Sequence, residues 1–286
     1  MASARDFQRQ INTVKNQARV FSALQTVSSV KFRKAEARVR RARPYAENVE
    51  QMMRDVAGSA SGDLPLLTGR EVSRVAVCTL TADRGLAGGF NAQVLRRTVR
   101  LRYEKDPGAL QVASGRKAVA FFRFRRVELA EVFTGFTDNP TYEKAREIGS
   151  TLTHLFDEEE ADEVYLVYNR FESVLNQRPM VKRLLPVAQE EDEEEGNGTS
   201  YMEYVPDAET VLKRLVPRYV ETMVWQALLE GAAGEHGARM TAMKNATDNA
   251  NDLVSDLTLQ MNKARQAQIT QEILEIVGGA EALSAG

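Results

Sequence analysis

The stretch with the clearest potential for chemistry is Thr81 to Asn91, which reads TADRGLAGGFN. A glycine-rich turn that leaves a strand and enters a helix is a place where α/β proteins often bind phosphate. The match is poor, because the stretch is neither G-x-G-x-x-G nor a P-loop with its Lys-Ser/Thr, and a tight turn needs glycine for backbone reasons alone. A nucleotide-processing enzyme and a purely structural turn both remain possible interpretations.

Other residues that could do chemistry are few. The two histidines, His154 and His236, fall in different predicted helices, and the single cysteine, Cys78, excludes an internal disulfide or a cysteine-cluster metal site. Cys78 lies in the apolar run VAVCTL, where a small buried side chain is expected. The acidic run from Gln189 to Ser200 is interpreted as a solvated loop, with a metal site as the weaker alternative.

The N-terminal segment has an apolar repeat with a period of 3.5 residues, which is typical of a coiled-coil seam. Only Gln25 and Ser28 interrupt it, and Pro44 is expected to kink the helix without ending the pattern. The seam consists of Phe7, Ile11, Val14, Ala18, Phe21, Gln25, Ser28, Phe32, Ala35, Val39, Ala42, Ala46, Val49, Met53 and Val56.

The C-terminal segment has a matching repeat. Residues 238–277 contain neither glycine nor proline, so nothing local stops a helix roughly 60 Å long at 1.5 Å per residue. Its expected seam consists of Met243, Ala246, Ala250, Leu253, Leu257, Met261, Ala264 and Ala267, and Glu230 is expected to be exposed. We expect the two terminal helices to pair as an antiparallel coiled coil, with an intermolecular coiled coil as the alternative. The C-terminal helix is longer and must overhang any such pairing.

Between the two helices, short β-branched runs alternate with helical patterns. Strands are expected at 72–81, at 110–114, within Val127–Gly135, at 163–171 and, as an edge strand, at 180–187, with helices between the first four. This alternation predicts a small, mostly parallel, Rossmann-like α/β domain. The expected division is an N-terminal coiled-coil helix (1–57), the α/β domain (70–187), an acidic linker (188–206) and a C-terminal coiled-coil helix (207–286).

Charge and hydropathy narrow the class of protein. Residues 1–57 carry a net charge of +7, residues 58–206 of −5 and residues 207–286 of −4, so the terminal helices are complementary in charge. The basic charges recur on helical faces without aromatic residues that could stack on bases, which argues against nucleic-acid binding. No stretch reaches the ~18 apolar residues of a membrane span, and the N-terminus lacks the apolar core of a secretory signal, so no direct membrane insertion is expected.

The arrangement of helix, α/β domain and helix resembles the gamma-subunit family of F-type ATP synthases. The resemblance rests on DRGLAGGFN, on the segment EYVPDAETVLKRLVPRYVETMVWQALLEGAAGEHGARMTAMKNATDNA and on the ending NKARQAQITQEILEIVGGAEAL. The ending is the most specific part, because Ile269, Thr270, Glu272 and Glu275 fit the family pattern without a gap, followed by Gly279-Ala280.

The resemblance implies a rotor shaft, without catalytic residues, cofactor or metal of its own. In that family the two helices enter a hexamer of alpha and beta subunits, while the α/β domain joins epsilon and rests on the ring of c subunits, whose rotation is driven by proton or sodium flow. By similarity, Arg265, Gln266, Thr270 and Glu275 contact the hexamer, and Lys31 lies near the moving ends of the beta subunits. Each of these could instead be an ordinary solvated helix residue, and Thr270 could bond its own helix.

Some positions depart from the family pattern. Ser22 and Leu24 stand where many members have lysine and methionine, which puts contacts near them in doubt, and Ala87 stands where cysteine is common. The absent cysteine pair and transit peptide point to a bacterial protein bound peripherally to the cytoplasmic side of the cell membrane. A free-standing coiled-coil adaptor and a phosphate-binding enzyme remain the alternatives from other classes.

Overall fold

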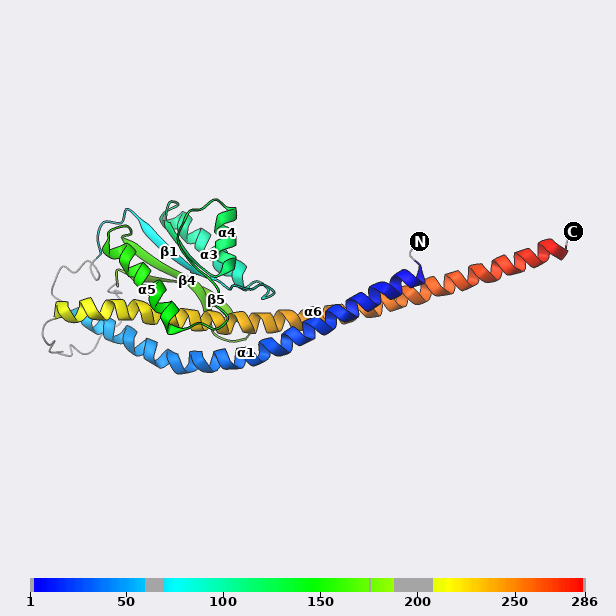
Figure 1. Ribbon diagram of the computed structural model, residues 1–286, viewed down its shortest axis with the longest axis horizontal. Coiled ribbons are helices and arrows are strands. Elements are labelled where there is room, and N and C mark those ends of the chain that lie inside the picture. The colour runs from blue at the N-terminus through cyan, green and yellow to red at the C-terminus, as the bar shows by residue number, and fades with distance from the viewer. Residues whose placement is uncertain (1–2, 60–68, 175, 188–207, 285–286) are drawn as a thin grey trace. The chain divides into compact units, whose positions relative to one another are not determined.

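The computed structural model describes residues 3–59, 69–174, 176–187 and 208–284 (Figure 1). The predicted acidic loop Gln189–Ser200 lies outside the described residues. Compact packing divides the chain into one unit of Met1–Val27 with Met240–Gly286 and a second unit of Ser28–Arg239. Each unit therefore contains a part of both terminal helices. The four-part division expected from the sequence stays a prediction.

Helix α1 runs from Ala4 to Ser59 and continues through Pro44. Every residue of its predicted seam whose burial is described, from Phe7 to Met53, is buried or half-buried. In the second unit the seam packs against the C-terminal helix, since Phe32 and Val39 share a core cluster with Leu229. The 3.5-residue period of the N-terminal segment therefore identified the packed face.

Helix α6 runs from Ala208 to Ser284 and includes Pro217 as well as five glycines. One of these glycines allows close packing, because a Cβ on Gly234 would lie 2.9 Å from the ring of Phe90. In the first unit, Met243, Ala250 and Leu257 are buried as predicted.

Two predicted seam positions of α6, Leu253 and Ala267, are wrong. Ala267 is exposed, because the last half-buried residue of the helix is Ala264. Leu253 is 47% exposed, and the neighbouring Val254 is half-buried in its place. The buried positions after Ala250 follow steps of four and three, at Val254, Leu257 and Met261, whereas the expected seam stepped by three and then four. Both orders give a mean period of 3.5, so the period alone did not fix which of two adjacent residues faces the partner helix.

The second unit contains a five-stranded sheet in the order β3-β2-β1-β4-β5. Its strands are β1 (Val75–Leu80), β2 (Leu110–Ser114), β3 (Leu129–Phe133), β4 (Glu163–Phe171) and β5 (Gln177–Leu185). The first four are parallel, and β5 is antiparallel to β4 at the edge of the sheet. The mostly parallel α/β fold and the edge strand are thus confirmed.

Helices cover both faces of this sheet. On one face, α3 (Phe90–Lys105) and α4 (Arg116–Phe124) pack over residues such as Val77 and Ala113. On the other face, α5 (Tyr142–Asp157) packs together with parts of α1 and α6 over residues such as Cys78. Burial raises the pKa of the Cys78 thiol to about 12, so this thiol is an inert core group.

Candidate functional site

The glycine-rich turn follows β1, whose neighbours β2 and β4 lie on opposite sides of it. Because the chain winds outward in both directions from β1, the ends of these strands form the crevice where α/β proteins usually bind ligands. The first question about function is therefore whether this crevice is built to receive a phosphate.

The chain's own carboxylate already occupies the anion position in this crevice. Asp83 accepts hydrogen bonds from the backbone N–H groups of Arg116 (3.0 Å), Gly135 (2.8 Å) and Thr137 (3.1 Å), and from the Thr137 hydroxyl (3.1 Å). Arg116 is the first residue of α4, so Asp83 caps the helix end that would otherwise attract an anion. Burial raises the pKa of Asp83, but these donors outweigh that effect and hold the pKa below its ordinary value.

The backbone of this crevice is packed too closely for an added group. Gly115 precedes α4 with a φ of +90°, and a Cβ there would lie 2.2 Å from the carbonyl oxygen of Thr81. The side chain of Asn91 accepts a hydrogen bond from the backbone N–H of Ala82 at 2.8 Å. The polar groups of the turn are thus bonded to the chain itself, which favours the structural interpretation of the turn over phosphate binding.

The turn is also tied to α6. The guanidinium of Arg239 donates two hydrogen bonds to the carbonyl oxygen of Gly85, at 3.2 and 3.1 Å, and forms an ion pair with the buried Glu235. Burial raises the pKa of Glu235 above its ordinary value despite Arg239. The glycine-rich turn therefore connects the end of β1 to the C-terminal helix through hydrogen bonds.

Lys31, a predicted contact residue, belongs to a second polar cluster. Its ammonium is ion-paired with Asp138, which also lies 3.5 Å from the imidazole of the buried His236. Burial lowers the pKa of His236. Burial raises the pKa of Asp138, but Lys31 and His236 outweigh it and leave a net decrease. Lys31 is therefore not a free solvated charge, because it links α1 to the loop before α5.

The two histidines are not brought together. His154 is exposed on α5 beside Glu158, whereas His236 is buried on α6. Among the residues that the structure describes, no group of three His, Cys, Asp or Glu side chains is placed to hold a metal ion. Within the same described residues, no helix is long and apolar enough to cross a membrane.

Glu230 corrects one expectation from the sequence. It is only 4% exposed, and its carboxylate accepts hydrogen bonds from the backbone N–H of Phe171 (3.1 Å), from Gln226 (2.8 Å) and from Arg43 (3.2 Å). Glu230 faces the end of β4, which no helical period in the sequence could indicate. Its buried carboxylate connects α6 to β4 and α1, so the expectation of an exposed side chain is wrong.

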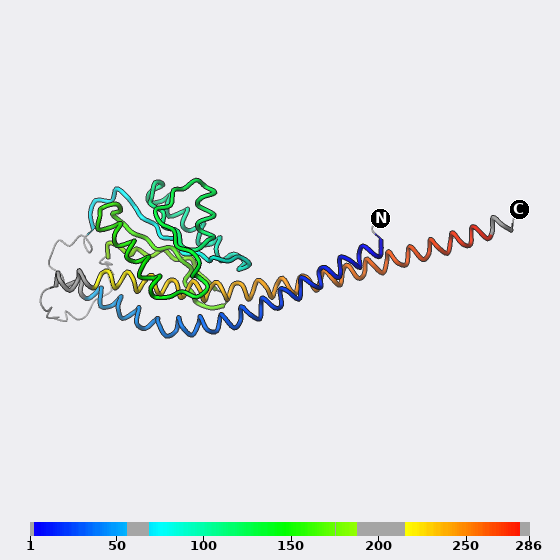
Figure 2. The backbone as a smooth tube through the Cα atoms, viewed as in Figure 1, coloured from blue at the N-terminus to red at the C-terminus, as the bar shows by residue number. Residues whose placement is uncertain are grey.

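The end of α6 has the opposite character. In the first unit, Ala264 is the last half-buried residue, and residues 265–280 are all exposed. Figure 2 shows this end of α6, in orange to red, continuing beyond the N-terminus of α1. We call this end of the helix the overhang (residues 265–284). Ile269, Ile273, Ile276 and Ala280 follow one another in it at steps of four, three and four, which places them along one stripe of the helix. Two further large apolar residues, Leu274 (65% exposed) and Val277 (55% exposed), widen it.

The polar residues of the predicted site lie on the same overhang. Arg265, Gln266, Thr270 and Glu275 are all exposed. The hydroxyl of Thr270 donates to the carbonyl oxygen of Gln266 at 2.9 Å, and Glu275 accepts from Gln271 at 3.1 Å. The structure therefore brings these four together on one helical segment but places Lys31 in the other compact unit.

These observations define a class of protein: an α/β domain packed on two long antiparallel terminal helices, one of which ends in an exposed, partly apolar segment. The sequence model of the protein family described as ATP synthase matches residues 3–283. The chain therefore belongs to this family, and within it to the gamma chains, as the following relatives show.

The relatives cover the whole chain. The ATP synthase gamma chain of Rubrobacter xylanophilus is 68% identical over an alignment 290 residues long, which covers 100% of this chain and 100% of its own. That of Moorella thermoacetica is 47% identical and covers 99% of this chain and 100% of its own. Among solved structures, the rotor of the Euglena gracilis mitochondrial ATP synthase aligns with a TM-score of 0.68 at 16% identity, over 93% of this chain and 98% of that one. This last similarity shows the fold.

Sequence reasoning missed most of the polar clusters. Asp83 was part of the quoted glycine-rich stretch, and its position directly after a strand was a usable signal. No spacing in the sequence brings Asp138 next to Lys31 or His236, because these residues are about 100 positions apart and meet only when the α/β domain packs on both helices.

Proposed function

We propose that this chain is the central rotor shaft of an F-type ATP synthase and is itself non-catalytic. The observation that carries the proposal is the overhang, roughly 30 Å of helix at 1.5 Å per residue, which exposes five large apolar residues in a chain whose relatives are ATP synthase gamma chains. Exposed apolar side chains gathered on one segment favour a receptor that covers them.

The receptor in this proposal is the hexamer of alpha and beta subunits. A shaft whose sides differ makes different contacts with each of three beta subunits, so its rotation changes their nucleotide sites in turn. The α/β domain joins epsilon and rests on the c ring, so that the chain lies peripherally at the cytoplasmic side of the cell membrane. Rotation of the c ring by protons or sodium ions then drives ATP synthesis.

Two kinds of contact divide the work of the overhang. The apolar side chains act as a bearing, because nonpolar contacts stabilise assembly without a preferred rotational register. Torque is transmitted chiefly by polar residues such as Arg265 and Gln266, because hydrogen bonds and ion pairs depend on direction. Thr270 and Glu275 also contact the hexamer. Lys31 acts near the moving ends of the beta subunits through the cluster that holds it against Asp138.

Two alternatives from other classes fit less well. A phosphate-binding enzyme would need an anion site in the crevice after β1, where the carboxylate of Asp83 lies. A free-standing coiled-coil adaptor would account for the paired helices but would leave the apolar side chains of the overhang without a receptor. Both alternatives predict that the chain purifies without alpha and beta subunits.

The test is co-purification from cells that express the complex. We expect a stoichiometric alpha–beta–gamma complex with ATPase activity, and no ATPase activity in the pure chain. Turnover by the pure chain that persists after contaminating hexamer is removed would refute the non-catalytic role. Failure to assemble with alpha and beta subunits would refute the shaft.

A further inference from the structure

The open edge of β5 is a second surface that the described residues leave without a partner. β5 is nine residues long and lies at the end of the sheet, where β4 is its one neighbouring strand among the described residues. Long exposed edge strands attract additional strands, and proteins usually cover or shorten them. The question is therefore which groups this edge presents and what they would bind.

The direction of the backbone groups of β5 follows from its pairing. Phe171 lies opposite Gln177, yet the N–H of Phe171 donates to Glu230, so this pair does not exchange backbone hydrogen bonds. In an antiparallel ladder such pairs alternate with bonded ones, so Pro179, Val181 and Arg183 also direct their backbone groups away from β4. Pro179 has no N–H to satisfy there, which agrees with its place on an edge.

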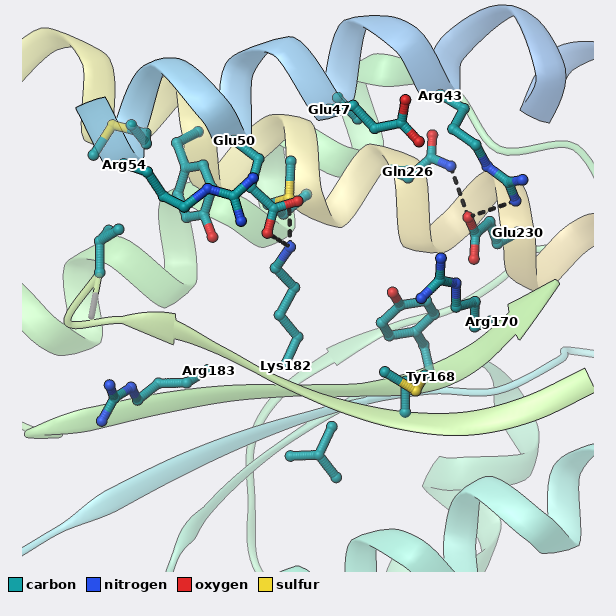
Figure 3. Close-up of a pocket in the computed structure, with 17 residues that line it drawn as sticks. Arg43, Glu47, Glu50, Arg54, Tyr168, Arg170, Lys182, Arg183, Gln226 and Glu230 are labelled. Atoms are coloured by element: carbon teal, nitrogen blue, oxygen red, sulfur yellow. Dashed lines mark hydrogen bonds and ion pairs between the residues drawn. The ribbon is translucent and has the colours of Figure 1, made fainter. Parts of the chain in front are cut away.

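The outward groups open into a pocket. A cavity of about 400 Å³ is lined by Val181 and Arg183 of β5, by residues of α1 such as Arg54 and by residues of α6 such as Glu230 (Figure 3). The side chain of Val181 packs on the other face of the sheet, toward α3, so its backbone is what this residue turns to the cavity. Within the described residues, no hydrogen bond is made by the N–H of Val181 or Arg183.

The surroundings of this edge are basic. The pocket is lined by five basic side chains against three acidic ones, and β5 itself carries Arg178, Lys182 and Arg183 without an acidic residue. Figure 3 shows the ammonium of Lys182 meeting Glu50 and the guanidinium of Arg43 meeting Glu230, and these pairs have N–O distances of 2.6 and 3.2 Å. Arg183 is also ion-paired, with Glu163 at 3.4 Å, so the surplus of positive charge lies at Arg54 and Arg170, for which no ion pair is found among the described residues.

Two like charges face each other at the edge. Arg170 of β4 and Arg178 of β5 lie directly opposite in the ladder, and both are exposed. Like charges in opposite positions destabilise a sheet. In the part of the chain that the structure describes, neither guanidinium forms an ion pair with a carboxylate. An acidic group from outside would relieve this repulsion.

We propose that the β5 edge binds an extended, acidic segment of another subunit of the complex, which adds to the sheet as a further strand. Backbone hydrogen bonds to Val181 and Arg183 hold the added strand, and its carboxylates neutralise Arg170 and Arg178. The inference rests on the proposed function in one respect, because it needs a multi-subunit complex to supply the partner.

The first test measures amide hydrogen exchange at single residues, in the chain alone and in the purified complex. The amides of Val181 and Arg183 should exchange readily in the chain alone and at least about tenfold more slowly in the complex, as expected for newly bonded amides. The amide of Lys182, which faces β4, serves as the internal reference and should be protected in both samples.

Two outcomes of this test overturn the inference. If both amides are protected in the chain alone, a segment of the same chain, such as its acidic residues 190–195, or a second copy covers the edge. If the complex assembles and both amides still exchange readily, no strand is added, and the proposed function stands without this inference. A chain that forms no complex would refute the proposed function itself.

The second test uses variants. Arg178→Glu converts the repulsive pair with Arg170 into an attractive one, so the melting temperature of the free chain should stay the same or rise while binding to the partner falls by about tenfold or more. Val181→Pro removes one outward N–H and should also weaken binding. Arg146→Glu, on the exposed side of α5, is the matched control and should bind normally. Normal binding by both β5 variants would refute the added strand.

Discussion

Two stretches of the same helix have opposite relations to the rest of the chain. Residues 216–239 of α6 are mostly buried against α1 and the α/β domain, with small side chains such as Ala233 and Gly234 where neighbours approach closely. Residues 265–280 are all exposed, although they include isoleucine, leucine and valine. Apolar side chains therefore indicate that a helix face makes a contact, but they do not indicate with which molecule. In the buried stretch the partner is the same chain, and in the overhang we propose another subunit.

The largest loss of stability is expected from Glu230→Lys, in the buried stretch of α6. The change places a second positive charge beside Arg43 and leaves the N–H of Phe171 without its acceptor. Loss of a buried ion pair costs about 3–5 kcal/mol, so the free energy of unfolding should fall at least that far. Urea unfolding of the chain alone measures this, and a loss below about 1 kcal/mol would contradict the position of Glu230.

Leu257→Asp tests the pairing of the helices in the first unit. Leu257 is 8% exposed, and a buried carboxylate there should destabilise the local pairing by about 2–4 kcal/mol. Amide exchange should accelerate around Leu257 and in the first turns of α1, while the sheet stays protected. Leu253→Asp is the matched control, one turn away and 47% exposed, and should have little effect. Equal effects of the two variants would mean that the packed face is misassigned.

Asp83→Asn tests the hydrogen bonds that the Asp83 carboxylate accepts in the crevice after β1. The variant replaces an ionised acceptor with an amide that meets three N–H donors, so it should cost about 1.5–3 kcal/mol at pH 7. Folding lowers the pKa of Asp83, so its carboxylate contributes to the free energy of unfolding above the ordinary unfolded pKa of about 3.9. This contribution is lost as the pH falls from there through the lowered pKa of the folded chain.

The stability difference between the two proteins should therefore shrink when urea unfolding is repeated near pH 3. Asp248→Asn, at an exposed position of α6, is the control and should match the parent at both pH values. A difference that grows on acidification would have the wrong sign for a carboxylate that is ionised in the folded chain.

The smallest effect on the chain alone is expected from deletion of Glu272–Gly286. All of residues 272–280 are exposed, so urea unfolding of the isolated chain should be unchanged within about 0.5 kcal/mol. The yield and heat stability of the complex should fall, because burial of each aliphatic side chain contributes about 1.5–3 kcal/mol. Complexes that survive should still couple ATP hydrolysis to ion pumping. Normal assembly with uncoupled hydrolysis would show that this segment carries torque.

Local sequence patterns were enough to predict the long helices, the packed face of α1 and the succession of strands along the chain. These features depend on local periodicity, since apolar residues every 3.5 positions or in short β-branched runs bury only one face. Period alone did not separate Leu253 from Val254, and it indicated an exposed Glu230 that is in fact buried. Such positions depend on which element lies opposite.

The roles of the polar residues depend on contacts that form in the folded chain. Lys31, Asp138 and His236 form one cluster because the α/β domain packs on both helices. Asp83 fills the crevice after β1 because the start of α4 and the loop after β3 both supply its donors. Ion pairs and hydrogen bonds act over a few ångströms between residues far apart in the chain, so their partners are set by packing. The apolar periodicity that drives that packing is local, and a single sequence displays it directly.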